Sequence, residues 1–466
     1  MQQADIFRIK NIGEAIGNKI IAIRETGELP QLKDWINKTP PGILEMVGIK
    51  GIGPKKIATI WKEMEIETVG ELLYACNENR LTRYKGFGEK TQSGILSAIE
   101  FFLQNQGNYL YSEAEKVVQS VTGKFRSLFP EDLLAPVGDF RAQAAVITRL
   151  EWLTTVSAEQ LSRFMFAMDG FTAVPDPEGS GRQSYKTAEG FPLFFELVKK
   201  EDFDHLLNQL PSPAAVPGVI QTSDIRGIVH AHSNWSDGSS SIEEMAKACM
   251  DKGLEYIVLT DHSKSAQYAN GLYPERVAEQ HRYIDELNSR LSPFRIFKSI
   301  ESDILNDGSL DYEPGVLAGF DLVIASIHSN LKMTEEKAMQ RLLRAIENPY
   351  TTILGHLTGR LLLSRNGYPV DHKTIIDACA AHHVVIELNA HPRRLDIDWT
   401  WIPYMTEKGV LLSIDPDAHT IQGLDDIKYG VLSAQKAGLT RENNLSSFSL
   451  PEIEDFIRKK KKLIQS

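Results

Sequence analysis

The stretch GIVHAHSNWSDG, residues 227–238, joins a short apolar run to two histidines, a polar loop and an Asp-Gly pair. Residues two apart on a strand point to the same side, so His230 and His232 are expected to face one way at a strand end. Two imidazoles in that position can bind a metal ion, although an isolated pair of this kind is more often an inert surface or core feature. The segments that follow have to decide between these two interpretations.

After residue 225 the sequence alternates between short β-branched apolar runs and helical patterns such as SIEEMAKACMDKG. The seven apolar runs are GIVHAHS, EYIVLTDH, RIFKSIESD, DLVIASIHS, TTILGHL, VVIELNA and VLLSIDPDAH. Alternating strands and helices predict a parallel sheet, and side chains at the C-terminal ends of such strands build the active site of a barrel. The second half of the chain is therefore expected to form an α/β barrel.

Six of these seven runs end in a side chain that can bind a metal, and the seventh ends in Asn389. The candidate ligands are His230, His232, Asp237, Asp261, His262, Glu301, His328, His356, Asp417 and His419. Each has an ordinary structural explanation when taken alone, such as a turn at Asp237, but chance does not account for their shared position at strand ends. Imidazoles and carboxylates without thiolates suit Mn²⁺, Zn²⁺ or Fe²⁺. So many ligands imply two or three ions and a bridging carboxylate, an arrangement that generates hydroxide near neutral pH and favours displacement at phosphorus.

The first 105 residues have a helical pattern interrupted by three glycine turns. The three stretches are IKNIGEAIGNKI (9–20), VGIKGIGPKKI (47–57) and RYKGFGEKTQSGI (83–95). Glycines allow the backbone to approach another chain closely, and the free N–H groups of a following helix attract phosphate. This pattern is typical of helix-hairpin-helix motifs that bind the DNA backbone, with a plain helical bundle as the alternative. The predicted DNA-binding residues are Gly51, Gly53, Lys55, Lys56, Gly86, Gly88 and Lys90.

Composition narrows the class of protein further. The 466 residues contain three scattered cysteines, which argues for a reducing compartment and against a disulfide framework or a cysteine-based zinc site. No apolar run approaches a membrane span and no signal peptide opens the sequence, so we expect a cytoplasmic protein without membrane contact. The formal net charge is −11, yet residues 1–100 hold 14 Lys and Arg against 13 Asp and Glu. The acidic remainder fits a site that collects cations.

With these residues in view, the chain resembles the PHP (polymerase and histidinol phosphatase) superfamily. The motifs that carry the resemblance are HAHSNWSDG, LTDHSK, ESDILNDGSLDY, IASIHS, GHLTGRLL, ELNAHPRRLD and DPDAH, which occur in this order. Over nearly its whole length the chain is similar to bacterial family X DNA polymerases with a C-terminal PHP domain. The resemblance implies a multidomain chain. A helix-hairpin-helix region would span 1–105, an α+β palm-like region 106–218, and a distorted (β/α)7 PHP barrel 219–466.

The resemblance also implies a grouping of the ligands around three divalent ions. The first ion would be held by His230, His232, Glu301 and Asp417, the second by Glu301, His328 and His356, and the third by Asp237, His262 and His419. Glu301 would bridge the first two ions, and Glu301, Asp417 and Arg360 would be the catalytic residues. Lys264, Arg393 and Arg394 are further candidates for phosphate contact, with surface ion pairs as the alternative.

The middle segment departs from the family pattern. Family members carry a G-S-x-R-R stretch followed by a D-x-D pair that binds magnesium, whereas the matching stretch here reads VGDFRAQAAVITRLEWL (137–153). Asp139 stands at the serine position, and Arg149 and Glu151 stand where the two aspartates belong. Because arginine repels Mg²⁺, we expect a palm that keeps its shape without nucleotidyl transfer.

The sequence thus favours a metal-dependent phosphoesterase that acts on DNA, most simply a 3′→5′ exonuclease or 3′-end-processing nuclease in DNA repair. Its expected partner is DNA, contacted at the backbone and at 3′ ends, and no protein partner is indicated. A small-molecule phosphatase of the histidinol phosphatase type is the first alternative. A non-catalytic DNA-binding scaffold with a structural metal site is the second.

Overall fold

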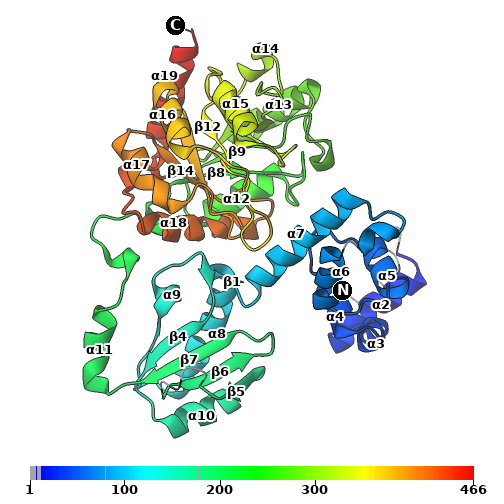
Figure 1. Ribbon diagram of the computed structural model, residues 1–466. Coiled ribbons are helices and arrows are strands. Elements are labelled where there is room, and N and C mark those ends of the chain that lie inside the picture. The colour runs from blue at the N-terminus through cyan, green and yellow to red at the C-terminus, as the bar shows by residue number, and fades with distance from the viewer. Residues whose placement is uncertain (1–6, 8–11, 79, 177–178, 180, 466) are drawn as a thin grey trace. The chain divides into compact units, whose positions relative to one another are not determined.

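The computed structural model describes residues 7, 12–78, 80–176, 179 and 181–465. The chain divides into two compact units, one up to Gln106 and one from Gly107 onward. Figure 1 colours them from blue to red along the chain. None of the helices in the described ranges is long and apolar enough to cross a membrane. The domain boundaries expected after residues 105 and 218 stay predictions.

The first unit is helical throughout its described part. Its helices are α2 (Glu14–Thr26), α3 (Pro30–Lys38), α4 (Pro41–Val47), α5 (Pro54–Lys62), α6 (Val69–Asn77), η1 (Leu81–Arg83) and α7 (Glu89–Asn105). Its core is formed by apolar side chains of α4 to α7, among them Met46, Ile60, Leu72 and Ile99. Part of the first glycine stretch, residues 9–11, lies outside the described residues.

The second unit begins with an α+β segment built on a mixed five-stranded sheet with the order β2-β4-β7-β6-β5. The five strands of this sheet are β2 (Leu134–Val137), β4 (Leu150–Thr154), β5 (Phe171–Val174), β6 (Gln183–Thr187) and β7 (Pro192–Leu197). Strands β1 (Tyr109–Leu110) and β3 (Val146–Ile147) form a separate antiparallel pair. The helices of the segment are α8 (Tyr111–Leu128), α9 (Gly138–Arg141), α10 (Ala158–Phe166) and α11 (Lys200–Asn208). The buried rings of Trp152 and Phe195 stack at 4.8 Å between neighbouring strands of this sheet.

The rest of the second unit is a seven-stranded parallel barrel whose strands follow one another in chain order. The strands are β8 (Gly227–Ala231), β9 (Tyr256–Leu259), β10 (Arg295–Asp303), β11 (Leu322–Ser326), β12 (Ile353–Leu354), β13 (Val385–Asn389) and β14 (Leu412–Asp415). The helices around them are α12 (Ile242–Asp251), α13 (Pro274–Leu291), α14 (Pro314–Leu317), α15 (Glu335–Ile346), α16 (His372–His382), α17 (Ile402–Glu407), α18 (Ile427–Gln435) and α19 (Leu450–Gln465). A parallel bridge between Ala231 and Ala418 joins the last strand region to the first.

All seven apolar runs read from the sequence form the seven barrel strands, so the expected (β/α)7 architecture is confirmed. Every residue of β8, β9, β11, β13 and β14 is buried, because a parallel sheet is covered on both faces. The C-terminal ends of parallel strands meet at one edge of the barrel, which places the candidate ligands together.

Candidate metal centre

The two histidines of the opening stretch converge by a route that simple strand alternation does not describe. The pairing of β8 with β9 shifts register between Ile228 and Ala231. His230 lies within this irregularity in the left-handed region, with φ 66°. The rings of His230 and His232 are 5.2 Å apart and both are fully buried. A bulge that turns a side chain toward a site is a common device beside active centres.

The loop after β8 brings a third ligand candidate to the same place. Gly238 approaches the carbonyl of His232 so closely that a Cβ atom would lie 2.5 Å from that oxygen. The Gly238 N–H donates to the Ser233 carbonyl at 2.9 Å, which closes the turn. The residue before it, Asp237, therefore points back toward the histidines, with Oδ1 3.9 Å from His232 Nδ1.

The four residues expected at the first ion lie together. His230 Nε2 is 3.3 Å from Glu301 Oε1 and 3.4 Å from Asp417 Oδ1. His232 Nε2 is 3.2 Å from Asp417 Oδ1 and 3.7 Å from Glu301 Oε2. Asp417 has φ 52°, a second ligand candidate in the left-handed region. Backbone strain of this kind gathers at functional sites, where the surrounding fold enforces it.

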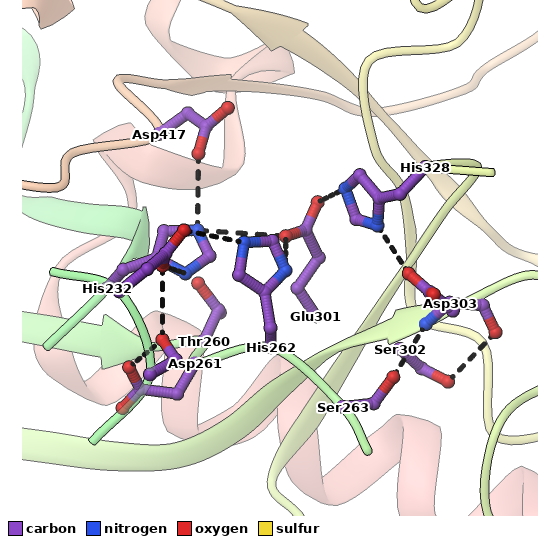
Figure 2. A network of polar contacts seen from close by, with 12 residues as sticks. His232, Thr260, Asp261, His262, Ser263, Glu301, Ser302, Asp303, His328 and Asp417 are labelled. Atoms are coloured by element: carbon purple, nitrogen blue, oxygen red, sulfur yellow. Dashed lines mark hydrogen bonds and ion pairs between the residues drawn. The ribbon is translucent and has the colours of Figure 1, made fainter. Parts of the chain in front are cut away.

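The other two expected groups are also assembled. His328 Nε2 and His356 Nε2 lie 3.1 and 3.0 Å from Glu301 Oε1, which forms the second group. Asp237 forms the third, with one carboxylate oxygen 3.6 Å from His262 Nε2 and the other 3.4 Å from His419 Nε2. Figure 2 shows Glu301 between His232, His262 and His328, with Asp417 on the side of His232.

The electrostatics of the centre are those of a site made for cations. Burial alone would raise the pKa of Glu301, but the neighbouring rings of His328, His230 and His262 outweigh it and hold that pKa well below its usual range. Burial opposes protonation of His262 and His328 too, yet Glu301 and nearby carboxylates raise their pKa values to about 10 and about 9. Protons on these rings thus balance buried carboxylates that divalent ions would balance instead.

The donor set fits divalent metal ions in two further respects. Among the described residues, several buried ring nitrogens have no hydrogen-bond partner: His230 Nε2, both nitrogens of His232, and His262 Nδ1. Each of these nitrogens lies near a carboxylate oxygen but forms no aligned hydrogen bond with it. Because buried polar atoms are normally hydrogen-bonded, this arrangement fits nitrogens and oxygens that share a metal ion. Bonds of about 2.0–2.2 Å at tetrahedral angles place neighbouring ligand atoms about 3.3–3.6 Å apart, which is close to the separations found here.

Two carboxylates that the sequence interpretation did not single out orient the ligand rings. His328 Nδ1 contacts Asp303 Oδ1, and His230 Nδ1 contacts Glu387 Oε1. Such contacts fix which ring nitrogen faces the metal. Both carboxylates could have been found from strand periodicity, since Asp303 lies two residues after Glu301 and Glu387 two residues before Asn389. Side chains two apart share a face.

Asp261, a strand-end candidate, has another task. Its carboxylate accepts hydrogen bonds from the N–H and hydroxyl of Ser233, from the Ser236 hydroxyl and from the Gln280 amide, at 2.6–2.8 Å. It therefore holds the loop of the opening stretch in place. Its oxygens already carry four bonds, so it is a support of the site and not a ligand.

The arginines proposed for phosphate contact occupy different positions. The Arg360 guanidinium donates to the carbonyls of Arg394 and Leu395 and pairs with Asp398 at 3.0 Å, so it holds the loop after β13. Arg394 Nε lies 3.4 Å from Asp417 Oδ2, next to the centre. Arg393 is exposed and Lys264 is half-buried. The catalytic role of Arg360 stays a prediction. Its hydrogen bonds show that it also holds the loop after β13 in position.

The palm-like sheet carries an ion-pair network at Arg149 and Glu151, the positions where the resemblance described above places the magnesium ligands. Glu151 Oε1 lies 3.3 Å from Arg149 and 3.0 Å from Arg182, beside a cavity of about 220 Å³. Glu151 Oε2 occupies the space that a Cβ at Gly138 would need. Among the described residues, the groups of His, Asp and Glu close enough to hold a metal all lie in the barrel.

The helix-hairpin-helix residues lie at helix starts. Gly53 precedes α5 and Gly88 precedes α7, so Lys55, Lys56 and Lys90 fall in the first turns of these helices. Lys55 and Lys90 are exposed and Lys56 is half-buried. Their contact with DNA stays a prediction.

Two family models match parts of the chain, and the chain is similar to several known proteins. A PHP domain model matches residues 229–391, and a SAM-like helix-hairpin-helix tandem model matches residues 43–100. A probable phosphatase of Thermoanaerobacter sp. (strain X514) is 26% identical over 50% of this chain and 95% of its own length. The crystal structure of a histidinol phosphate phosphatase from Lactococcus lactis matches 46% of this chain and 94% of that chain, with 17% identity and a TM-score of 0.36.

One relative spans almost the entire chain. The DNA polymerase/3′-5′ exonuclease PolX of Bacillus subtilis (strain 168) is 31% identical over 98% of this chain and 91% of that protein. Its match runs through the helical unit, the palm-like sheet and the barrel alike. The chain belongs to the PolX family, and it combines a helix-hairpin-helix tandem with a PHP domain.

Proposed function

We propose that this protein is a divalent-metal-dependent 3′→5′ exonuclease that hydrolyses DNA without synthesising it. The observation that carries the proposal is the convergence of five histidines, His230, His232, His262, His328 and His356, on one buried carboxylate, Glu301, with Asp417, Asp237 and His419 beside those histidines. The likeness to a PolX protein named as an exonuclease supports the choice of substrate.

Within this proposal each group of ligands has a task. His230, His232, Glu301 and Asp417 would hold one ion, His328 and His356 a second through Glu301, and Asp237, His262 and His419 a third. Bound Mn²⁺ or Zn²⁺ would supply a hydroxide near neutral pH and neutralise charge on the phosphate. The chain's own part is to keep the ring nitrogens aimed by Asp303 and Glu387, and to place the Arg394 guanidinium beside Asp417.

The expected absence of synthesis rests on the palm-like sheet. Arg149 and Arg182 both form ion pairs with Glu151. At the corresponding positions a polymerase of this family needs carboxylates that are free to bind Mg²⁺. An arginine at that point opposes the metal that nucleotidyl transfer requires. The palm-like segment then has no nucleotide-adding role in this proposal.

A small-molecule phosphatase is the second candidate, because the relatives named as probable phosphatases match about half of this chain. DNA is favoured over a metabolite because the helix-hairpin-helix match at residues 43–100 adds a segment for which a metabolite enzyme has no use.

Single-stranded oligonucleotides labelled at either the 5′ or the 3′ end, incubated with Mn²⁺, test the proposal. We expect a 5′-labelled strand to shorten stepwise, a 3′-labelled strand to release its label at once, and a primed template with dNTPs to show no extension. Histidinol phosphate should be hydrolysed far more slowly than DNA. Faster turnover of histidinol phosphate would favour the phosphatase, and template-directed extension lost in Glu151→Gln would contradict the inactive palm.

A further inference from the structure

The loop after β9, residues 263–273, is tied to the candidate metal centre by a backbone bridge and side-chain hydrogen bonds. Ser263 and Leu272 form a bridge, and a Cβ on Gly271 would lie 1.9 Å from the Ser263 carbonyl oxygen, so the two arms of the loop touch. Ser265 donates from its N–H to Asp311 at 2.7 Å and from its hydroxyl to Asp303 at 2.9 Å. The latter carboxylate is the one that orients His328, which ties the loop directly to a predicted ligand.

A second anchor holds the far part of this loop. Asn270 has φ 56°, and its amide donates to the Trp235 carbonyl at 3.1 Å. Arg276 donates to the carbonyls of Asn270 and Trp235. Trp235 belongs to the loop of the opening stretch that carries Asp237, so the loops after β8 and β9 hold each other in place.

Tyr268 lies between these anchors and faces solvent beside the centre. Its side chain is 73% exposed, while its ring centroid lies 6.1 Å from that of His262. The ring is therefore beside a predicted ligand and open to a bound molecule.

An exposed tyrosine is ordinary when it stands alone on a surface. Tyr268 differs because its loop is pinned at both ends to the metal centre. A flat apolar ring held at that distance from a phosphate-hydrolysing site is suited to stacking on a planar group joined to the phosphate. In a nucleotide that planar group is the base, and stacking on an aromatic ring tolerates any base.

We propose that Tyr268 is a specificity-determining residue whose ring stacks on the base at the 3′ end of the strand being hydrolysed. This inference rests on the proposed nuclease function and deepens it. The three ion groups act on the phosphate alone, which every phosphate ester carries. Tyr268 adds recognition of the base and so favours a nucleotide end over an ester without one.

The test compares two oligonucleotides that differ only in the 3′-terminal residue, which is thymidine in one and a tetrahydrofuran residue without a base in the other. Tyr268→Leu should lower kcat/KM for the thymidine end roughly tenfold, mainly through KM, and leave the base-free end unchanged. Tyr268→Phe keeps the ring and should behave as wild type. Tyr273→Leu removes another exposed tyrosine, 52% exposed at the start of α13, and should change neither substrate.

Metal content and thermal unfolding of each variant show whether the centre and the fold are intact, and Tyr268→Phe preserves the test if the leucine variant is unstable. Equal losses on both substrates in Tyr268→Leu would overturn the stacking inference while leaving the nuclease function standing. If Tyr268→Phe lost as much activity on the thymidine end as Tyr268→Leu, the stacking inference would also be overturned, because the hydroxyl and not the ring would then be responsible. If the wild type degrades neither oligonucleotide, the proposed function itself fails.

Discussion

At the scale of single residues, Glu301 is the centre of the site. One or other of its carboxylate oxygens lies 3.0–3.7 Å from a ring nitrogen of each of five histidines: His230, His232, His262, His328 and His356. A neutral group at this position would leave these rings facing one another without a negative charge between them. The bridging role predicted for Glu301 therefore has a direct test.

Glu301→Gln keeps the size of the side chain and removes its charge. We expect it to lower bound metal by more than one ion per chain and to reduce DNA hydrolysis by at least about 100-fold, because a two-ion site needs its bridging carboxylate. His356→Ala, which removes a ligand from the second group only, should lose about one ion. Native mass spectrometry counts the metal in both variants, and a full metal complement with near-normal hydrolysis in Glu301→Gln would reject the bridge.

At the scale of elements, the loops after the strands decide where ligands point. The loop of the opening stretch turns at Gly238, and Asp261 at the end of β9 holds the middle of that loop through Ser233 and Ser236. Asp237 can reach His262 and His419 only if this turn keeps its close backbone approach. The close approach of Gly238 to the His232 carbonyl makes the turn sensitive to one added methyl group.

Gly238→Ala should displace Asp237 and His232 because its Cβ would meet backbone atoms of His232 and Ser233 at 2.5–2.8 Å. We expect loss of about one ion and a fall in DNA hydrolysis of about 100-fold, the cost of a misplacement of about 1 Å in a catalytic group. Gly315→Ala is the matched control, since nothing lies within 4 Å of its Cβ position. Equal metal content and activity in the two variants would show that the turn does not position the ligand.

At the scale of the whole molecule, the protein combines a helical unit with a barrel that holds the chemistry. In the proposed function, the first grips the DNA backbone and the second cuts it. The three lysines at the starts of α5 and α7 would supply the positive charge for that grip. The grip should therefore depend on salt, whereas the chemistry on a small phosphodiester should not depend on these lysines.

Replacing Lys55, Lys56 and Lys90 together by alanine should weaken binding of single-stranded DNA. The slope of log affinity against log salt should fall by about 2, because each phosphate that a lysine neutralises on a single strand contributes about 0.7 to it. Hydrolysis of bis(4-nitrophenyl) phosphate should stay as in wild type. Lys33→Ala with Lys38→Ala is the control, because those lysines pair with Glu28 and Asp34 at 2.7 and 3.3 Å. An equal fall in the slope for the control would remove the special role of the two helix starts.

Much of this organisation could be read from the sequence because it is local. The seven barrel strands were recognisable as β-branched runs, and residues at their C-terminal ends must meet when the strands are parallel. The helix starts after Gly53 and Gly88 were likewise readable from glycine turns followed by lysines. These features depend on neighbours in the chain, so the order of the residues determines them.

Only the tertiary structure decided which strand-end groups face the centre and which support it. The bulge that turns His230 inward depends on pairing with β9, and Asp261 is turned away by serines of another loop. Arg360 is committed to carbonyls of the loop after β13, although its motif suggested phosphate contact. Chain order determined which ligand types are present and at which end of the barrel they lie. Contacts between distant segments decided their individual tasks, because a buried polar group takes the partner that the fold brings within hydrogen-bond distance.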